Sequence, residues 1–555
     1  MKQTNWYKNS VIYQIYPKSF CDKNGDGIGD IKGIISKLDY LQQLGVNCVW
    51  LSPVYDSPQE DNGYDISNYK TIYAPYGTMD DFKEMLDGMH KRGIRLIMDL
   101  VVNHTSSEHN WFKEAIKNPN SKYRDYYIIK KGKNHGKKAP TNWSGFFGGS
   151  TWERIGDSED YYLHLFAKGQ PDLNWENPEL REEIKDVLRF WLDMGVDGFR
   201  CDVITLISKT QTFKSSFPKI ALTGSKNFIN GPKLHQYLHE LYKDVLSNYD
   251  CMTVGETVLS NIDQAILLVE PERQELSMVF NFDHTDTDNF MGIKYLYRKF
   301  KLKRLKKVFG HWQNGMHNIG WNSLFLENHD QRRCVGRFGT RDDTEFREVS
   351  SKMLGTMYFF LQGTPFIYEG QEIGMTNPHF KSIDETIDIE IRNMNNMAKK
   401  NIFLRPIIRT HMLDVTRDNA RTPMQWDDSV NAGFSNVKPW LNVCSNYKTI
   451  NTIEAIKDKS SVFYYYKSLI DLRLDNDVIR DGIYEEIKVG GNSVYAYKRI
   501  LKNKEYLIIC SFKDRDVKFK YLNKLQGYNL VLSNYNNHNT DKLYPYEARV
   551  YYKER

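Results

Sequence analysis

Residues 177–204, NPELREEIKDVLRFWLDMGVDGFRCDVI, decide the fold, because they join an amphipathic helix to a short apolar strand. Apolar side chains recur at helical spacing over 177–195, and GFRCDVI (198–204) is nearly continuous in apolar residues. Strands of that composition are buried on both faces, as parallel strands covered by helices are. The stretch therefore predicts one helix-and-strand unit of an α/β protein.

The same unit recurs along the chain. Helical segments such as 31–45 and 78–93 alternate with apolar runs, and the second of them begins with the capping residues Thr78 and Asp81 and ends at Gly93. The other seven runs are VIYQIYP (11–17), CVWLSP (48–53), RLIMDLV (95–101), CMTVGE (251–256), SMVFNF (277–282), SLFLENHD (323–330) and TPFIYEG (364–370). Eight strands joined by crossover helices predict a (β/α)8 TIM barrel. An open doubly wound sheet is less favoured, since no Gly-rich phosphate turn follows the first strand.

Two segments interrupt this alternation. Residues 105–173 are rich in Asn, Lys, Gly and aromatic residues and far exceed an ordinary loop, which predicts an inserted domain B after strand three. Residues 480–555 alternate polar and apolar residues with turn signals, which predicts a C-terminal antiparallel β-sandwich with a structural role. The barrel, domain A, is then expected in two parts, 1–104 and 174–479.

Composition excludes several classes of protein. The 555 residues are 40% hydrophobic and 14% aromatic, which excludes a disordered chain. A net charge of +6 predicts neither a nucleic-acid nor a membrane partner. The sequence shows no leader peptide and no run of the roughly 18 apolar residues that a membrane span needs. Its seven scattered cysteines form no C-x-x-C pair, so we expect a cytoplasmic protein with reduced thiols, and a monomer.

Carboxylates end three of the predicted strands, and the C-terminal strand ends of a TIM barrel carry its active site. Arg200 points to the same face as Asp202 and is expected to keep that carboxylate ionised. Glu256 ends an apolar strand near other anions, which favours a protonated carboxyl, and Asp330 follows strand seven. An ionised and a protonated carboxyl form the pair that cleaves a glycosidic bond. Helix capping is the alternative for each carboxylate taken alone.

Five motifs resemble those of glycoside hydrolase family 13, the α-amylase family, and fall on or between the predicted strands: DLVVNHT (99–105), QPDLNW (170–175), GFRCDVI (198–204), TVGE (253–256) and FLENHD (325–330). The resemblance implies that Asp202 is the nucleophile, Glu256 the general acid/base and Asp330 a group that holds sugar hydroxyls. His104 and His329 are implied to bind the same glucose, and their contexts lack the i, i+4 spacing of a zinc helix. The implied mechanism retains configuration and places the two carboxyls about 5–5.5 Å apart.

Within that family the chain resembles the oligo-1,6-glucosidases, or isomaltases. The likeness lies in three segments: EDNGYDISNY (60–69), GMTN (374–377) and ARTPMQWDD (420–428). The resemblance implies release of glucose from non-reducing ends. It also implies that Asp61 and Arg421 pair at the bottom of the pocket, where they meet the non-reducing glucose, and that Tyr64 stacks on the sugar ring. Val203 matches the residue of α-1,6-acting members, where α-1,4-acting glucosidases tend to have Ala. Plain barrel packing is the alternative for Val203.

Other functions remain open. Trehalose-6-phosphate hydrolases share the catalytic motifs. Arg332 stands after Gln331, where we expect a proline, and an extra guanidinium near the aglycone at the mouth of the barrel suits recognition of a phosphate. A broader α-1,4- or sucrose-acting α-glucosidase is a further enzymatic alternative. Some proteins with this barrel are inactive carbohydrate-binding or transporter-associated subunits, but here the carboxylate set is complete. A small oligosaccharide is therefore the expected partner.

The loop at 22–30, DKNGDGIGD, places oxygen donors at alternate positions with a glycine at the sixth, which suits a hard cation. It resembles the calcium loop of the same glucosidase subgroup, although Gly33 stands where an EF-hand has its bidentate Glu. The resemblance implies a structural Ca²⁺ held by Asp22, Asn24, Asp26, Ile28 and Asp30. An Asp/Asn/Gly turn without metal is the alternative.

Overall fold

A computed structural model of the chain describes residues 4–219, 221–290, 293–340, 344–400 and 411–554. Eight strands form one sheet, in which every recorded pairing is parallel, in the order β11-β10-β9-β5-β2-β1-β15-β14. A parallel bridge between Val279 and Asn322 joins its two ends, so the sheet closes into the predicted barrel. Each predicted run contains one strand: β1 (Ile12–Ile15), β2 (Cys48–Leu51), β5 (Arg95–Leu100), β9 (Gly198–Cys201), β10 (Met252–Glu256), β11 (Met278–Phe280), β14 (Ser323–Leu324) and β15 (Thr364–Tyr368).

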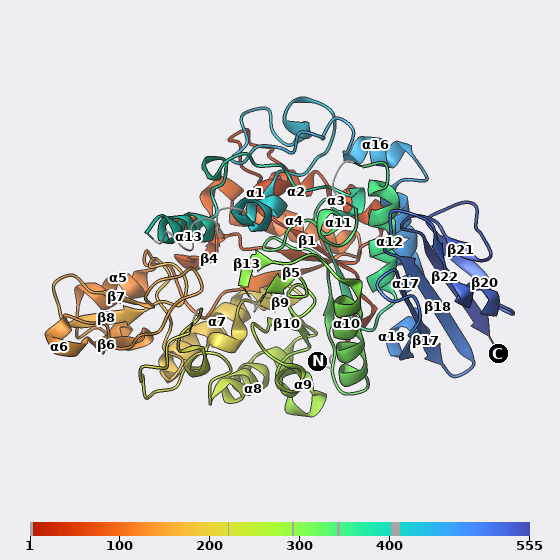
Figure 1. Cartoon of the computed structure of the whole chain (residues 1–555). Helices are drawn as coiled ribbons and strands as arrows, with labels where there is room; N and C mark the ends of the chain where they lie inside the picture. The colour runs from red at the N-terminus through yellow and green to blue at the C-terminus, as the bar shows by residue number, and fades with distance from the viewer. Residues whose placement is uncertain (1–3, 220, 291–292, 341–343, 401–410, 555) are drawn as a thin grey trace.

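Helices surround this barrel (Figure 1). The predicted capping box is present, since Thr78 and Asp81 hydrogen-bond each other's backbone amides at the start of α4. The helix predicted over 31–45 is two helices separated by two residues. The principal helices are α2 (Ile31–Ile35), α3 (Leu38–Leu44), α4 (Met79–Lys91), α7 (Pro178–Met194), α8 (Leu234–Asp244), α9 (Ile262–Val269), α10 (Leu302–Met316), α12 (Arg347–Phe359) and α17 (Val462–Arg473).

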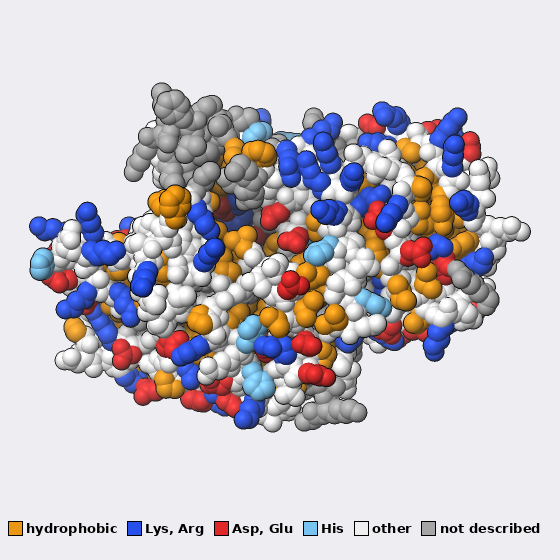
Figure 2. All heavy atoms as spheres, turned by 60° about the horizontal axis from the view of Figure 1, so that its bottom comes forward, with side chains coloured by type: hydrophobic (Ala, Val, Ile, Leu, Met, Phe, Trp, Pro, Cys, Tyr) orange, Lys and Arg blue, Asp and Glu red, His pale blue; other side chains and the backbone are white. Residues whose placement is uncertain are grey.

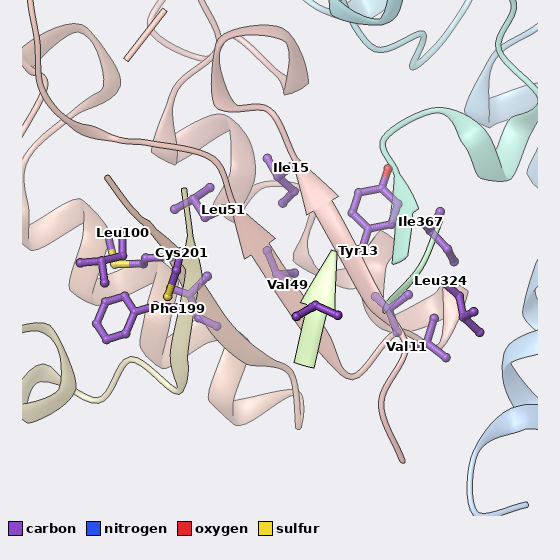
Figure 3. Close-up of a cluster of buried hydrophobic side chains, with 14 of the residues drawn as sticks. Val11, Tyr13, Ile15, Val49, Leu51, Leu100, Phe199, Cys201, Leu324 and Ile367 are labelled. Carbon is purple, nitrogen blue, oxygen red and sulfur yellow. The ribbon is translucent and has the colours of Figure 1, made fainter. Parts of the chain in front are cut away.

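Both faces of the barrel strands are buried, which explains their continuous apolar sequences. Along β1, Tyr13 and Ile15 belong to the large cluster that includes the surrounding helices, part of which Figure 3 shows. The alternate residue Ile12 belongs to a second cluster, with Trp50 and Phe366, drawn mainly from the strands. A period of two thus divides each strand between the barrel interior and the helical layer.

The segment between β5 and β9 forms its own small sheet at one end of the molecule, at the left of Figure 1. Its antiparallel strands run in the order β6-β8-β7 (Ile129–Lys131, Asp160–Leu163 and Trp152–Arg154), and helices α5 (Asn110–Lys117) and α6 (Lys133–Gly136) accompany them. Trp143 and Trp152 pack in one apolar cluster with Val203 and Leu206, which follow β9. This packing places the insertion beside the end of the strand that carries Asp202.

The C-terminal part is an antiparallel β domain at the opposite end (Figure 1). Its main sheet has the order β16-β17-β18-β22-β20, and a two-stranded sheet pairs β19 with β21. The bounds are β16 (Ile483–Glu486), β17 (Val494–Leu501), β18 (Lys504–Ser511), β19 (Val517–Lys518), β20 (Asn529–Ser533), β21 (Lys542–Leu543) and β22 (Ala548–Glu554). Among the described residues, no helix is both long enough and apolar enough to cross a membrane.

Candidate active site

Neighbouring barrel strands bring Asp202 and Glu256 together. β9 and β10 pair in parallel, with Val254 opposite Arg200 and Gly255 opposite Cys201. Asp202 directly follows β9, and Glu256 is the last residue of β10, so the register sets the two carboxylates side by side. Only 6% of Asp202 and 9% of Glu256 is exposed. The predicted pair therefore forms a buried site at the carboxyl ends of two adjacent strands.

Arg200 is shared by three carboxylates. Its Nη1 donates to Asp99 at 2.6 Å and to Asp202 at 2.5 Å, and its Nη2 donates to Glu256 at 2.7 Å. The predicted pairing of Arg200 with Asp202 is present, and the guanidinium also reaches Glu256 on the neighbouring strand, which the sequence did not indicate. Burial raises the pKa of Asp202 well above its ordinary value, and Arg200 opposes this rise. The expectation that Arg200 keeps Asp202 ionised is therefore opposed by burial and by the neighbouring carboxylates Glu256 and Asp99.

Val203, directly after the nucleophile candidate, has a left-handed backbone with φ 35° and ψ 39°. Such values are rare for a β-branched residue and cost on the order of 1–3 kcal/mol. In this conformation the Val203 N–H donates to Glu256 Oε2 at 2.9 Å. The backbone of the turn that directly follows Asp202 therefore holds the carboxylate of Glu256. Val203 lines a cavity together with these two carboxylates.

Asp330 lies across this cavity, between two cations and a histidine. Arg421 Nη2 donates to Asp330 Oδ1 at 2.7 Å, and His329 Nε2 lies 3.1 Å from Oδ2. Burial acts to raise the pKa of Asp330, but His329, Arg421 and Arg417 together lower it well below its ordinary value. His329 Nδ1 lies 2.8 Å from the amide of Gln14, which leaves Nε2 to face Asp330. Asp330 is thus held ionised and can accept hydrogen bonds from a sugar.

The ion pair of Asp61 differs from the predicted one. Asp61 was expected to pair with Arg421, but its partner is Arg417, whose Nη2 lies 3.4 Å from Asp61 Oδ1. Arg417 also pairs with Asp388 at 2.7 Å and reaches Asp330 at 3.6 Å, while Arg421 serves Asp330. The two arginines are four residues apart, about one helical turn, so sequence spacing does not choose between them. No motif indicated Arg417 or Asp388.

Aromatic and polar side chains line the cavity beside Asp61. Tyr64 stacks on the His329 ring, with centroids 5.4 Å apart, and its hydroxyl lies 2.8 Å from His329 Nε2. His104 Nε2 lies 3.0 Å from the Tyr64 carbonyl oxygen, and burial lowers the pKa of His104 to about 4, so its imidazole is neutral. Gln170, within a quoted motif but not predicted as a site residue, donates to Asp61 at 3.2 Å. Stacking of Tyr64 on a sugar stays a prediction.

The cavity has a volume of about 650 Å³, ample for a short oligosaccharide. The insertion contributes Phe146, Phe147 and Phe166 to one wall. β13 (Ile293–Tyr297) and α13 (Ile389–Lys400) also contribute lining residues, and the Tyr295 hydroxyl joins the two elements by donating to Glu390 at 2.6 Å. The insertion therefore shapes the substrate cavity directly.

Arg332, the extra guanidinium predicted near the aglycone, is ion-paired. Its Nη2 donates to Asp288 at 2.7 Å, and Arg337 donates to the same carboxylate at 2.6 Å. Seven carboxylates line the cavity against four lysines and arginines: Asp61, Asp202, Glu256, Asp283, Asp286, Asp330 and Glu390 against Lys294, Arg332, Arg337 and Arg417. The charge around the cavity is thus net negative when all are ionised.

The five candidate cation ligands lie in one loop whose carboxylates form successive turns. Asp22 accepts from the amides of Gly25 and Gly27, Asp26 from that of Ile28, and Asp30 caps α2 through Gly33. Each carboxylate keeps a lone pair for a hard cation, so the donor set is compatible with one. The carboxylates of Asp22, Asp26 and Asp30 do not bring their oxygens within 4.8 Å of one another; among the described residues, the acidic group that does so is Glu182, Glu240 and Asp244.

The chain is similar to known proteins over nearly its whole length. The model of the alpha amylase catalytic domain matches residues 14–482, and the chain belongs to the α-amylase family of glycoside hydrolases. It is 50% identical over 557 residues to an oligo-1,6-glucosidase of Parageobacillus thermoglucosidasius, covering 98% of each chain. It is 47% identical to the trehalose-6-phosphate hydrolase of Bacillus subtilis, covering 93% of this chain and 91% of that one. The crystal structure of the Bacillus licheniformis trehalose-6-phosphate hydrolase superposes with a TM-score of 0.92 at 44% identity, covering 99% and 100%.

Proposed function

We propose that this glycoside hydrolase is an exo-acting, retaining α-glucosidase that releases glucose from isomaltose and short isomalto-oligosaccharides by cleaving α-1,6 bonds. The observation that carries the proposal is the buried network of ion pairs beside the cavity, in which Arg417 connects Asp61, Asp330 and Asp388. A cavity closed by ion pairs beyond the first sugar admits chain ends and excludes chain interiors. The similarity to oligo-1,6-glucosidases supports the linkage.

The proposed mechanism uses residues that surround one glucose. Asp202 attacks the anomeric carbon while Glu256 protonates the leaving oxygen, and the C–O bond to the aglycone breaks as the glycosyl ester forms. Glu256 then takes a proton from water, which hydrolyses the ester with net retention. Asp330, held ionised by Arg421 and His329, hydrogen-bonds the hydroxyls of the ring as positive charge develops.

The ion pairs of Arg332 bear on the choice between a neutral and a phosphorylated sugar. Asp288 is paired with both Arg332 and Arg337, which reduces the positive charge that these two side chains offer to a ligand. A phosphate would have to compete with this carboxylate for the guanidiniums, which costs affinity. This observation supports isomaltose over trehalose 6-phosphate, although both classes of relative are similar in sequence.

The test of the proposed function compares kcat/KM for isomaltose, maltose, sucrose and trehalose 6-phosphate under one set of conditions. We expect isomaltose to exceed each of the others by about tenfold or more, in line with the 1–3 kcal/mol that pocket shape supplies. The highest value for trehalose 6-phosphate would overturn the proposal. Cleavage of internal bonds in a long dextran, seen as a rapid fall in viscosity, would contradict exo-action.

Replacing Val203 by Ala is expected to broaden the linkage preference. The smaller side chain widens the space next to the nucleophile, so the ratio of kcat/KM for maltose over isomaltose should rise about tenfold. Val203→Ile keeps the β-branched shape and serves as the control, with the ratio expected to stay near its wild-type value. An unchanged ratio in Val203→Ala would leave barrel packing as the whole role of this side chain.

We also propose a structural Ca²⁺ in the loop at 22–30, with Asp22, Asn24 and Asp26, the Ile28 carbonyl and Asp30 as ligands. Ca²⁺ that binds the folded state raises the melting temperature by mass action. We expect a higher Tm in Ca²⁺ than in EDTA, and no such difference in Asp26→Ala, whose side chain is exposed. Asp428→Ala removes another exposed carboxylate and should keep the Ca²⁺ effect. A Tm insensitive to Ca²⁺ in the wild-type protein would contradict the proposal.

A cytoplasmic location is part of the proposal. All seven cysteines are free and buried, which a reducing compartment permits. A monomer remains the expected state, to be checked by light scattering.

A further inference from the structure

Two segments of the chain that carry lysines and no carboxylates meet at the end of the molecule formed by the insertion. Residues 126–152 contain five lysines and no Asp or Glu, and residues 203–239 contain another five with none. Figure 2 shows Lys and Arg side chains gathered at this end of the molecule. We define the basic face by its exposed residues, Lys130, Lys131, Lys133, Lys137, Lys138, Lys214 and Phe217.

The two segments are held against each other by several contacts. Trp143 Nε1 donates to the Lys214 carbonyl at 2.9 Å, and the side chain of Asn142 exchanges two hydrogen bonds with the backbone of Ser216 at 2.8 and 2.9 Å. The Lys130 ammonium lies 4.7 Å from the centre of the Phe213 ring. The six exposed lysines of the basic face therefore lie on two segments that pack against each other.

The charge of the basic face is not neutralised locally. Within the described residues, none of its six lysines forms an ion pair, whereas Lys209 and Lys233 of the same segments pair with Asp172 and Glu176. Carboxylates border the basic face at β8: Asp160 is opposite Lys131 in the strand register but pairs with Arg124, and Glu159 faces His135 at 3.8 Å. The chain's net charge of +6 conceals this clustering, which is why bulk composition predicted no anionic partner.

An exposed aromatic residue stands at the tip of the second segment. Phe217 is 90% exposed, the largest exposure recorded for a large apolar side chain in the described chain, and the exposed Pro218 follows it. Its neighbours Lys214 and Lys219 are exposed as well. An apolar side chain flanked by ammonium groups matches the boundary between lipid headgroups and acyl chains, where the ring leaves water and the lysines meet phosphates.

We propose that the basic face binds the surface of an anionic lipid membrane. Each lysine near an anionic surface contributes about a fivefold gain in partitioning at low salt. Phe217 adds a contribution to membrane binding that does not depend on salt. One aromatic residue among six lysines fits a lipid surface better than single-stranded nucleic acid, whose binding grooves supply aromatic rings to successive bases. Such binding is peripheral and needs no membrane-spanning helix.

The experiment is co-sedimentation of the full chain with vesicles of phosphatidylglycerol and with vesicles of phosphatidylcholine at low salt. We expect binding to the first and none to the second. Changing Lys131, Lys137 and Lys138 together to Gln should weaken binding by about tenfold or more, and Phe217→Ala should weaken the part that survives added salt. The matched control changes Lys518, Lys520 and Lys524 to Gln, which removes equal charge from exposed positions of the C-terminal domain. Turnover of isomaltose in solution should stay unchanged in all variants, so failure of this proposal leaves the proposed function intact.

Several outcomes would overturn the proposal. Absence of sedimentation with phosphatidylglycerol vesicles would do so directly. Equal weakening in the control triple variant would show that only total charge matters. Binding that is unaffected by Phe217→Ala and is displaced by single-stranded RNA at matched charge would place a nucleic acid, not a membrane, on the basic face.

Discussion

An Asp202→Asn variant is expected to lose about 10⁴-fold or more in kcat/KM for isomaltose while keeping its fold. The amide is a far poorer nucleophile than the carboxylate, so the glycosyl ester does not form. The change preserves side-chain volume within the buried cluster around Arg200, which favours a stable variant. Steady-state kinetics together with a thermal melt measure the two effects separately. Wild-type turnover in the folded variant would refute the assignment.

The anomer of the product separates the role of Asp202 from that of Glu256. With an activated aryl α-glucoside and azide, removal of the nucleophile in Asp202→Gly should yield β-glucosyl azide, because azide attacks from the vacated side. Removal of the acid/base in Glu256→Gly should yield α-glucosyl azide, because the glycosyl ester still forms first. The same anomer from both variants would contradict these roles. For the wild-type enzyme, glucose released first as the β-anomer would exclude a retaining mechanism.

The barrel could be predicted from the sequence because its strands are buried on both faces. Nearly continuous apolar runs such as 95–101 carry that signal without any long-range information, and polar residues such as Asn103 and His104 follow this run. The position of Asp202 and Glu256 follows from the same fact, since parallel register brings consecutive strand ends together. The capping box of α4 is equally local, because Thr78 and Asp81 lie within one turn.

The contacts that close the cavity could not be predicted in the same way. Arg417 lies in an irregular segment, more than 350 residues from Asp61, and its choice of partners depends on how that segment folds over the barrel. Asp388 is fully buried there with no apolar strand to indicate it. The sharing of Arg200 by three carboxylates likewise depends on side-chain reach across strands, which spacing does not determine. Local sequence patterns thus predicted which strand ends carry the site. They did not predict the long-range ion pairs that determine its shape.

An Arg200→Gln variant is expected to lose both stability and activity. Asp99, Asp202 and Glu256 then remain buried without their shared cation, which costs roughly 3–5 kcal/mol in the free energy of unfolding. Arg200 lowers the pKa of Asp202 against the effect of burial, so its removal raises that pKa further. Asp202 must be ionised to attack, and kcat/KM falls as the pH drops through its pKa. The acidic limb of the pH profile should therefore move to higher pH.

Arg333→Gln is the matched control for this prediction. Arg333 is also fully buried, and it pairs with Glu327 at 3.0 Å outside the lining of the cavity. Its loss should lower the melting temperature by a comparable amount, because a buried carboxylate again loses its cation. The acidic limb should stay in place, since Arg333 contacts neither Asp202 nor Glu256 in the recorded hydrogen bonds. A shift of the limb in both variants, or in neither, would mean that Arg200 acts on the fold alone and does not tune the nucleophile.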